Sequence, residues 1–82
     1  MHALVIGLGV SGKAAALLLK QKGYAVTGVD AKSKEIEGIV VLPESAVQDV
    51  KDYDLVVLSP GIAADHPLYL AAKQENKNIV GE

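Results

Sequence analysis

Residues 7–12, GLGVSG, give the clearest indication of the fold of this chain. They match the pattern G-x-G-x-x-G, follow an apolar run over residues 3–6, and precede a helical pattern that begins at Val10. In that setting the first glycine permits a tight turn, the second lets backbone N–H groups approach a diphosphate, and the third lets the helix lie close to the strand. Unpaired N–H groups and the helix dipole then favour an anion. A tight turn without a ligand is the alternative.

The same stretch also resembles the start of a second phosphate-binding motif. Gly7, Gly12 and Lys13 fit the beginning of a P-loop, but Ala14 stands where a serine or threonine hydroxyl must hold magnesium. Without that hydroxyl the metal loses a ligand. The sequence therefore argues against ATP hydrolysis at this loop.

Outward from the glycine turn, apolar runs alternate with helical patterns. In the first helix we expect Val10, Ala14, Leu17 and Leu18 to form the buried stripe. The expected strands are residues 3–6, 25–30, 39–42 and 55–58, with a fifth beginning at Ile79, and the expected helices run from Val10 toward Gly23, over 44–51, and from Pro67. This order predicts an α/β fold, a Rossmann-like open parallel sheet of about five strands with helices on both faces.

In the weaker helical segment, residues 44–51, we expect Ala46, Val47 and Val50 to point inward. Pro43 is expected to stop the strand before it. Residues 31–38, between the second and third expected strands, are polar and include Gly38, which indicates a loop.

The bulk composition limits the classes of function. Its 82 residues suffice for a single domain, residues 1–82, and a net charge of −2 argues against a nucleic-acid partner. The apolar runs are far shorter than the roughly 20 residues that cross a bilayer, so we expect no membrane span. Met1 leads directly into a strand, which predicts no signal peptide. The absence of cysteine fits a cytoplasmic location.

An acidic residue, Asp30, ends the second expected strand. In dinucleotide-binding folds a carboxylate near this position accepts hydrogen bonds from ribose hydroxyls, which supports a nucleoside in the ligand. The alternative is an aspartate that caps the turn after the strand. Lys32 is expected either to neutralise a phosphate or flank the base, or to be a solvated surface lysine.

The remaining polar residues have plain structural interpretations. Residues 59–61, Ser-Pro-Gly, are compatible with a simple turn, and His66 with a helix-start residue that fixes its loop. Asp49, Asp52 and Asp54 favour a solvated acidic turn over a metal cluster. We therefore predict no catalytic residue and no metal site in this chain.

Several motifs together resemble one family. They are SPGI at residues 59–62, DHP at 65–67 and IVGE at 79–82, beside GLGVSG and the Gly-Val-Asp tip at 28–30. The combination resembles the N-terminal domain of the MurD-type enzymes of the Mur ligase family, and the resemblance extends over essentially the whole chain.

The resemblance implies a site for UDP-N-acetylmuramoyl-L-alanine. Backbone N–H groups around Val10 and Ser11, with the Ser11 hydroxyl, would hold the diphosphate, and the residues after the second strand would lie beside the uridine. Ala31 and Lys32 depart from the family, where a hydroxyl residue and an arginine are common; lysine lacks the flat, forked guanidinium. The implied substrate-binding residues are Gly9, Val10, Ser11, Gly12, Asp30, Ala31, Lys32 and Gly61.

The resemblance also implies what lies elsewhere in such an enzyme. ATP and magnesium would act in a central domain, and D-glutamate would be captured by a C-terminal domain, for peptidoglycan biosynthesis. Neither domain is contained in these 82 residues, so we expect binding of the UDP substrate without turnover. Two other classes remain open, namely an NAD(H)-binding regulatory or dehydrogenase module, and an interaction module without a ligand.

Overall fold

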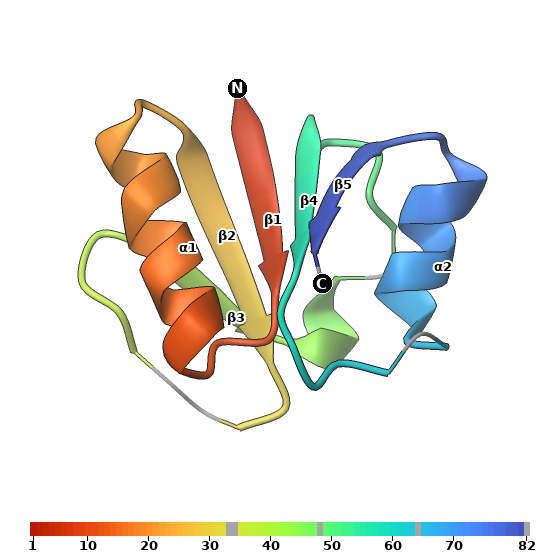
Figure 1. Cartoon of the computed structure of the whole chain (residues 1–82), viewed down its shortest axis with the longest axis horizontal. Coiled ribbons are helices and arrows are strands. Elements are labelled where there is room, and N and C mark those ends of the chain that lie inside the picture. Colours follow the sequence, from red (N-terminus) through yellow and green to blue (C-terminus); the bar gives the residue numbers. More distant parts are fainter. Residues whose placement is uncertain (33–34, 48, 64, 82) are drawn as a thin grey trace.

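Five parallel strands in the order β3-β2-β1-β4-β5 form the centre of the computed structural model (Figure 1). The structure describes residues 1–32, 35–47, 49–63 and 65–81. The elements are β1 (His2–Ile6), α1 (Val10–Gln21), β2 (Ala25–Asp30), β3 (Val40–Pro43), the short 3₁₀ turn η1 (Glu44–Ala46), β4 (Leu55–Leu58), α2 (Pro67–Gln74) and β5 (Asn78–Gly81). The predicted α/β, Rossmann-like parallel sheet is confirmed.

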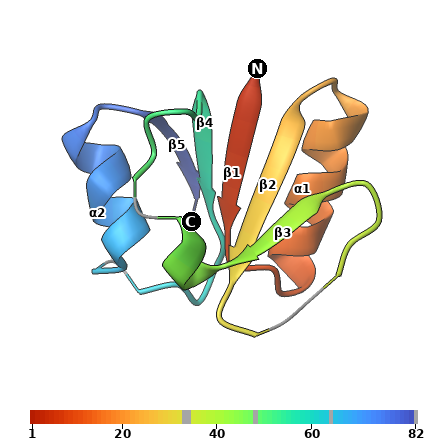
Figure 2. The same cartoon turned by 180° about the vertical axis from the view of Figure 1, so that it is seen from behind.

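The two helices lie on opposite faces of the sheet (Figures 1 and 2). On one face, Leu4 and Ile6 of β1 share a core with Leu68 of α2. On the other face, Val5 packs in a separate core with Ala16 of α1. Successive residues of a strand point to opposite faces, so a central parallel strand covered on both sides must be apolar throughout. This explains the unbroken apolar run in β1, and it confirms helices on both faces.

The prediction that Val10, Ala14, Leu17 and Leu18 form the buried stripe of α1 is wrong. The side chain of Val10 is 92% exposed, and Ala14, Leu17 and Leu18 also face solvent. The inward face instead consists of small residues and one larger side chain, namely Gly12, Ala15, Ala16 and Leu19. The cause is the close approach of α1 to the sheet, because an approach this close leaves room mainly for small side chains.

The segment 44–51 is also not the helix that its pattern predicts. Among the residues of this segment that the structure describes, only those of η1 are helical, and Val47 is extended, with φ −117° and ψ 114°. Val47 and Val50 are buried as expected, whereas Ala46 is exposed and Gln48 lies outside the described residues. The chain must travel here from the carboxyl end of β3 to the amino end of β4. Extended backbone covers about 3.3 Å per residue and a helix only about 1.5 Å, so the distance favours extension.

The third strand begins and ends one residue later than expected. Pro43 is its last residue and pairs with Asp30, and β3 is at the edge of the sheet, where proline is tolerated. Within the described residues, neither helix has the length and apolar character needed to cross a bilayer.

Replacement of Gly12 by alanine tests the close approach of α1. A Cβ atom at this position would overlap the carbonyl oxygen of Gly7 and Oγ of Ser59. We expect Gly12→Ala to lower the free energy of unfolding by at least about 2 kcal/mol, in the upper part of the range for overpacked sites. Urea denaturation measures this loss.

The matched control is Gly9→Ala, because a Cβ atom at Gly9 would meet nothing within 4 Å. Its cost should stay below about 1 kcal/mol, the scale of a changed helix cap. Equal losses of unfolding free energy in the two variants would show that the close approach of α1 to β1 is not what excludes a side chain at Gly12.

Candidate functional site

The strand register brings three residues to the same level at the carboxyl edge of the sheet. Ile6 at the end of β1 is paired with Val29 of β2 and with Leu58 of β4. The residues that follow these three, Gly7, Asp30 and Ser59, therefore meet at the edge where ligands bind in open α/β sheets. This level is the starting point of the candidate site.

The first two residues of the glycine turn, Gly7 and Leu8, are both held against β2. Gly7 has a φ of +89°, a region that glycine enters readily, and its N–H donates to the carbonyl of Val29 at 2.8 Å. The side chain of Leu8 is buried against Gly28, where a Cβ atom would lie 2.8 Å from its methyl carbons. The turn is therefore held against β2, and the missing side chain of Gly28 leaves room for Leu8.

The start of α1 is open to solvent. Gly9 is the N-cap residue, and its carbonyl accepts the Lys13 N–H at 2.8 Å. Among the described residues, no side chain caps this end, and the first turn contains no acidic residue. Val10 and Ser11 are exposed. Helix N-termini carry unpaired N–H groups and a partial positive charge, so this end can receive an anion.

The carboxylate of Asp30 accepts two backbone N–H groups. Its Oδ2 accepts from Leu8 at 2.7 Å, and its Oδ1 accepts from Lys32 at 2.8 Å. The second bond is the turn cap that the sequence left open as an alternative. The first bond ties the tip of β2 to the glycine turn, which the sequence did not predict. Ala31 and Lys32 are exposed beside it, and their contact with a nucleoside stays a prediction.

The turn after β4 is joined to the glycine turn by a hydroxyl. The Ser59 N–H donates to the carbonyl of Ile6 at 3.1 Å, and its Oγ donates to the carbonyl of Gly7 at 2.6 Å. Ser59 is only 7% exposed. Gly61 follows in an exposed position with a φ of +91°, and a Cβ atom there would meet nothing within 4 Å. Ser59 was missed in the sequence; the available signal was a polar residue directly after a buried strand.

A hollow of about 320 Å³ adjoins the start of α1 on the side of β4 and β5. Ser11 and Ala15 line it from α1, Ser59 and Pro60 from the turn after β4, and Val80 from β5. Asp30 does not line this hollow. The helix start is therefore bordered by the tip of β2 and, separately, by a partly apolar hollow.

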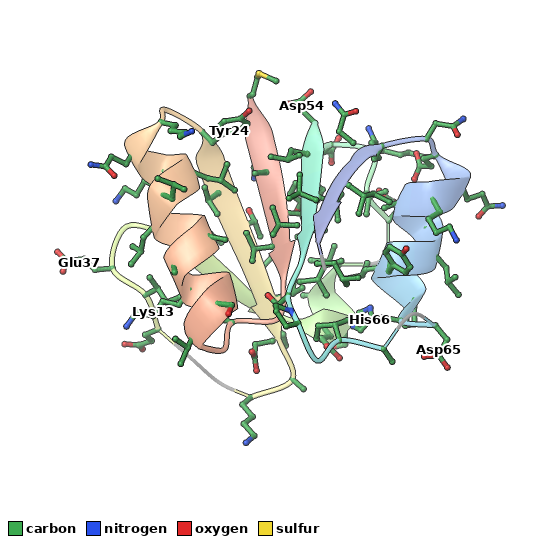
Figure 3. The ribbon with its side chains drawn as sticks, viewed as in Figure 1. Lys13, Tyr24, Glu37, Asp54, Asp65 and His66 are labelled. Carbon is green, nitrogen blue, oxygen red and sulfur yellow. The ribbon has the colours of Figure 1, made fainter. Side chains whose placement is uncertain are left out.

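His66 is the helix-start residue that the sequence predicts. Its Nδ1 accepts the Leu68 N–H at 3.1 Å, so the ring proton is on Nε2, which donates to Oε1 of Glu44 at 2.9 Å. Figure 3 labels His66 near the start of α2. Glu44 is a carboxylate partner that the sequence did not identify. It joins the start of α2 to η1, and the geometry is that of a structural link.

The other residues considered from the sequence lie in structural or solvated positions. Lys13 is exposed on α1 (Figure 3). Asp49 and Asp54 are exposed and accept the N–H groups of Lys51 and His2, at 3.1 and 2.8 Å. Asp52 is exposed as well, and a solvated acidic turn stays the interpretation of these three aspartates.

Comparison with known proteins identifies one family. Residues 1–81 match the family described as Mur ligase MurD-like, N-terminal domain. The chain is 41% identical, over 98% of its length, to a UDP-N-acetylmuramoylalanine–D-glutamate ligase from Protochlamydia amoebophila. Ligases of the same name from Aquifex aeolicus and Synechococcus are 42% and 39% identical over the whole chain. The chain spans 18–20% of the length of these three relatives.

Two substitutions at His66 test its structural role. His66→Ala removes both the N-cap acceptor and the bond to Glu44, and we expect the free energy of unfolding to fall by about 1–2 kcal/mol. His66→Asn keeps an acceptor at the N-cap, so at least half of that loss should be recovered. Thermal unfolding followed by circular dichroism measures both. A His66→Ala variant as stable as the parent protein would contradict the assigned role.

Proposed function

Because the chain belongs to the family of MurD-like N-terminal domains of Mur ligases, we propose that it binds the UDP portion of UDP-N-acetylmuramoyl-L-alanine. The observation that carries the proposal is the uncapped start of α1, which follows the glycine turn and opens at the carboxyl edge of the sheet. The relatives' printed name, UDP-N-acetylmuramoylalanine–D-glutamate ligase, supports the choice of ligand.

The diphosphate is the part of the ligand that suits the helix start. The N–H groups of Val10 and Ser11 belong to the first turn of α1, and the Ser11 side chain is exposed beside them. Negative oxygens at this end gain charge-assisted hydrogen bonds and a favourable helix dipole. Gly9 leaves the approach clear, because a Cβ atom there would meet nothing within 4 Å apart from the backbone next to it.

The uridine and the sugar belong on different sides of that diphosphate. Asp30, Ala31 and Lys32 at the tip of β2 are placed beside the uridine, with Lys32 exposed and able to turn toward the base or a phosphate. The hollow lined by Ser11, Ser59 and Val80 gives room for the part beyond the diphosphate. The backbone of Gly61 contributes from the turn after β4 in this arrangement.

The ligase reaction belongs to the rest of such an enzyme in this proposal. Addition of D-glutamate would use ATP and magnesium bound by other domains, and the chain spans about a fifth of its relatives' length. The residues here do not fit a magnesium–ATP site, because Ala14 stands where the P-loop needs a hydroxyl. The chain would therefore hold the substrate without converting it.

Titration of the ¹⁵N-labelled chain with UDP tests the proposal. We expect shifts in the backbone amide signals of Gly9, Ser11, Asp30 and Gly61. Uridine without phosphates should bind at least about 10-fold more weakly, since a hydrogen bond to a charged group contributes roughly 1.5–3 kcal/mol. Gly9→Ala should weaken UDP binding while the fold is retained, because its methyl group would occupy the open approach to the helix start.

NADH serves as the competing ligand in this experiment. A preference for NADH without any response to UDP would favour the dehydrogenase-type module to which Asp30 at the tip of β2 also conforms. Unmoved amide signals with both ligands would reject nucleotide binding by the chain.

A further inference from the structure

We propose that Asp30 and Ser59 are positioning residues that hold one peptide group, Gly7–Leu8, by its two ends. The peptide precedes the amides at the start of α1, and the inference rests on the proposed binding of a diphosphate there. Neither side chain needs to touch the phosphates for this role. Each acts through the backbone that presents the N–H groups to the ligand.

The geometry of the peptide group is the basis of this inference. Its carbonyl oxygen, on Gly7, accepts the Ser59 hydroxyl at 2.6 Å, and its N–H, on Leu8, donates to the Asp30 carboxylate at 2.7 Å. Ser59 directly follows β4 and Asp30 is the last residue of β2, and these two strands flank β1 on either side. One peptide plane is thus held from both neighbouring strands.

Glycine makes such a restraint necessary. Gly7 has a φ of +89° and no side chain, so sterics alone leave the following peptide freer to rotate than they would after another residue. A rotated Gly7–Leu8 peptide would lose its N–H partner and turn its carbonyl away from Ser59. The orientation of the next amides, from Gly9 onward, depends on the same bonds. The two side chains therefore supply the rigidity that glycine lacks.

The charge of Asp30 supports a positioning role. A carboxylate beside the expected position of a diphosphate is unfavourable by simple charge repulsion. Its two oxygens accept the N–H groups of Leu8 and Lys32, which stabilise the charged form. The two N–H groups thus compensate for the negative charge of Asp30 near the ligand, and the same bonds hold the turn in place.

Ser59 separates a positioning role from direct contact with UDP, because the hollow that it lines is assigned to the part of the ligand beyond the diphosphate, which UDP lacks. It is 7% exposed, and its hydroxyl proton is directed to Gly7. Ser59→Ala removes only that donor. We expect hydrogen exchange at the Leu8 amide to become at least about 5-fold faster, and UDP to bind about 5-fold more weakly, the equilibrium effect of one ordinary hydrogen bond.

Amide exchange and UDP titration of the same labelled chain measure both effects. The matched control is Ser45→Ala, an exposed serine in η1, which should change neither. Exchange in the middle of β1 and β4 should stay within about 2-fold of the parent value, which separates a local effect from general unfolding. Ser59→Cys keeps a donor at this position, a weaker one on a larger atom, and intermediate values are expected. It also replaces Ser59→Ala if that variant does not fold.

The outcomes distinguish this inference from the proposed function. Faster Leu8 exchange together with weaker UDP binding supports the positioning role. Unchanged Leu8 exchange overturns it, and so does faster exchange with unaltered UDP affinity. If the parent chain itself does not bind UDP, the proposed function fails. Leu8 exchange alone then tests whether Ser59 restrains the Gly7–Leu8 peptide. Asp30→Asn, which keeps one acceptor oxygen, should raise Leu8 exchange in the same direction.

Discussion

The structure depends on the close approach of α1 to β1. A Cβ atom at Gly12 would overlap both the Gly7 carbonyl oxygen and Ser59 Oγ, so at this point the helix has no room for a side chain of its own against the turn after β1. This close approach selects small residues for the buried face of α1. In the same region the first turn of the helix is exposed, and the Gly7 carbonyl lies within reach of the turn after β4.

Much of the fold follows from local sequence. The strands could be predicted because buried parallel strands are unbroken apolar runs, and the glycine spacing placed the turn between β1 and α1. The buried stripe of α1 could not, because hydrophobicity selects Val10, Leu17 and Leu18 whereas the approach of the helix selects small residues. The extended path at Val47 was hidden for another reason: it reflects the distance between two strand ends, which is a property of the topology.

For the candidate site too, local sequence predicts some features, whereas others depend on contacts between distant parts of the chain. Asp30 could be located at the tip of β2 from sequence, but its bond to Leu8 depends on the register between β1 and β2. The partner of Ser59 is 52 residues away along the chain, and no local pattern contains such a contact. The comparison gives the family of the chain, and the geometry adds how the glycine turn at the start of α1 is held.

The alignment of the strand ends has a consequence for how such a domain can vary in length. Gly7, Asp30 and Ser59 stand level only because the ladders between β1 and its two neighbours are in register. One extra residue inside β2 or β4 would displace a tip by about 3.3 Å and turn its side chain to the opposite face. Insertions in the loops distant from this edge carry no such penalty. Length differences among related domains should therefore be confined to those loops, while β1, β2 and β4 keep a constant number of residues.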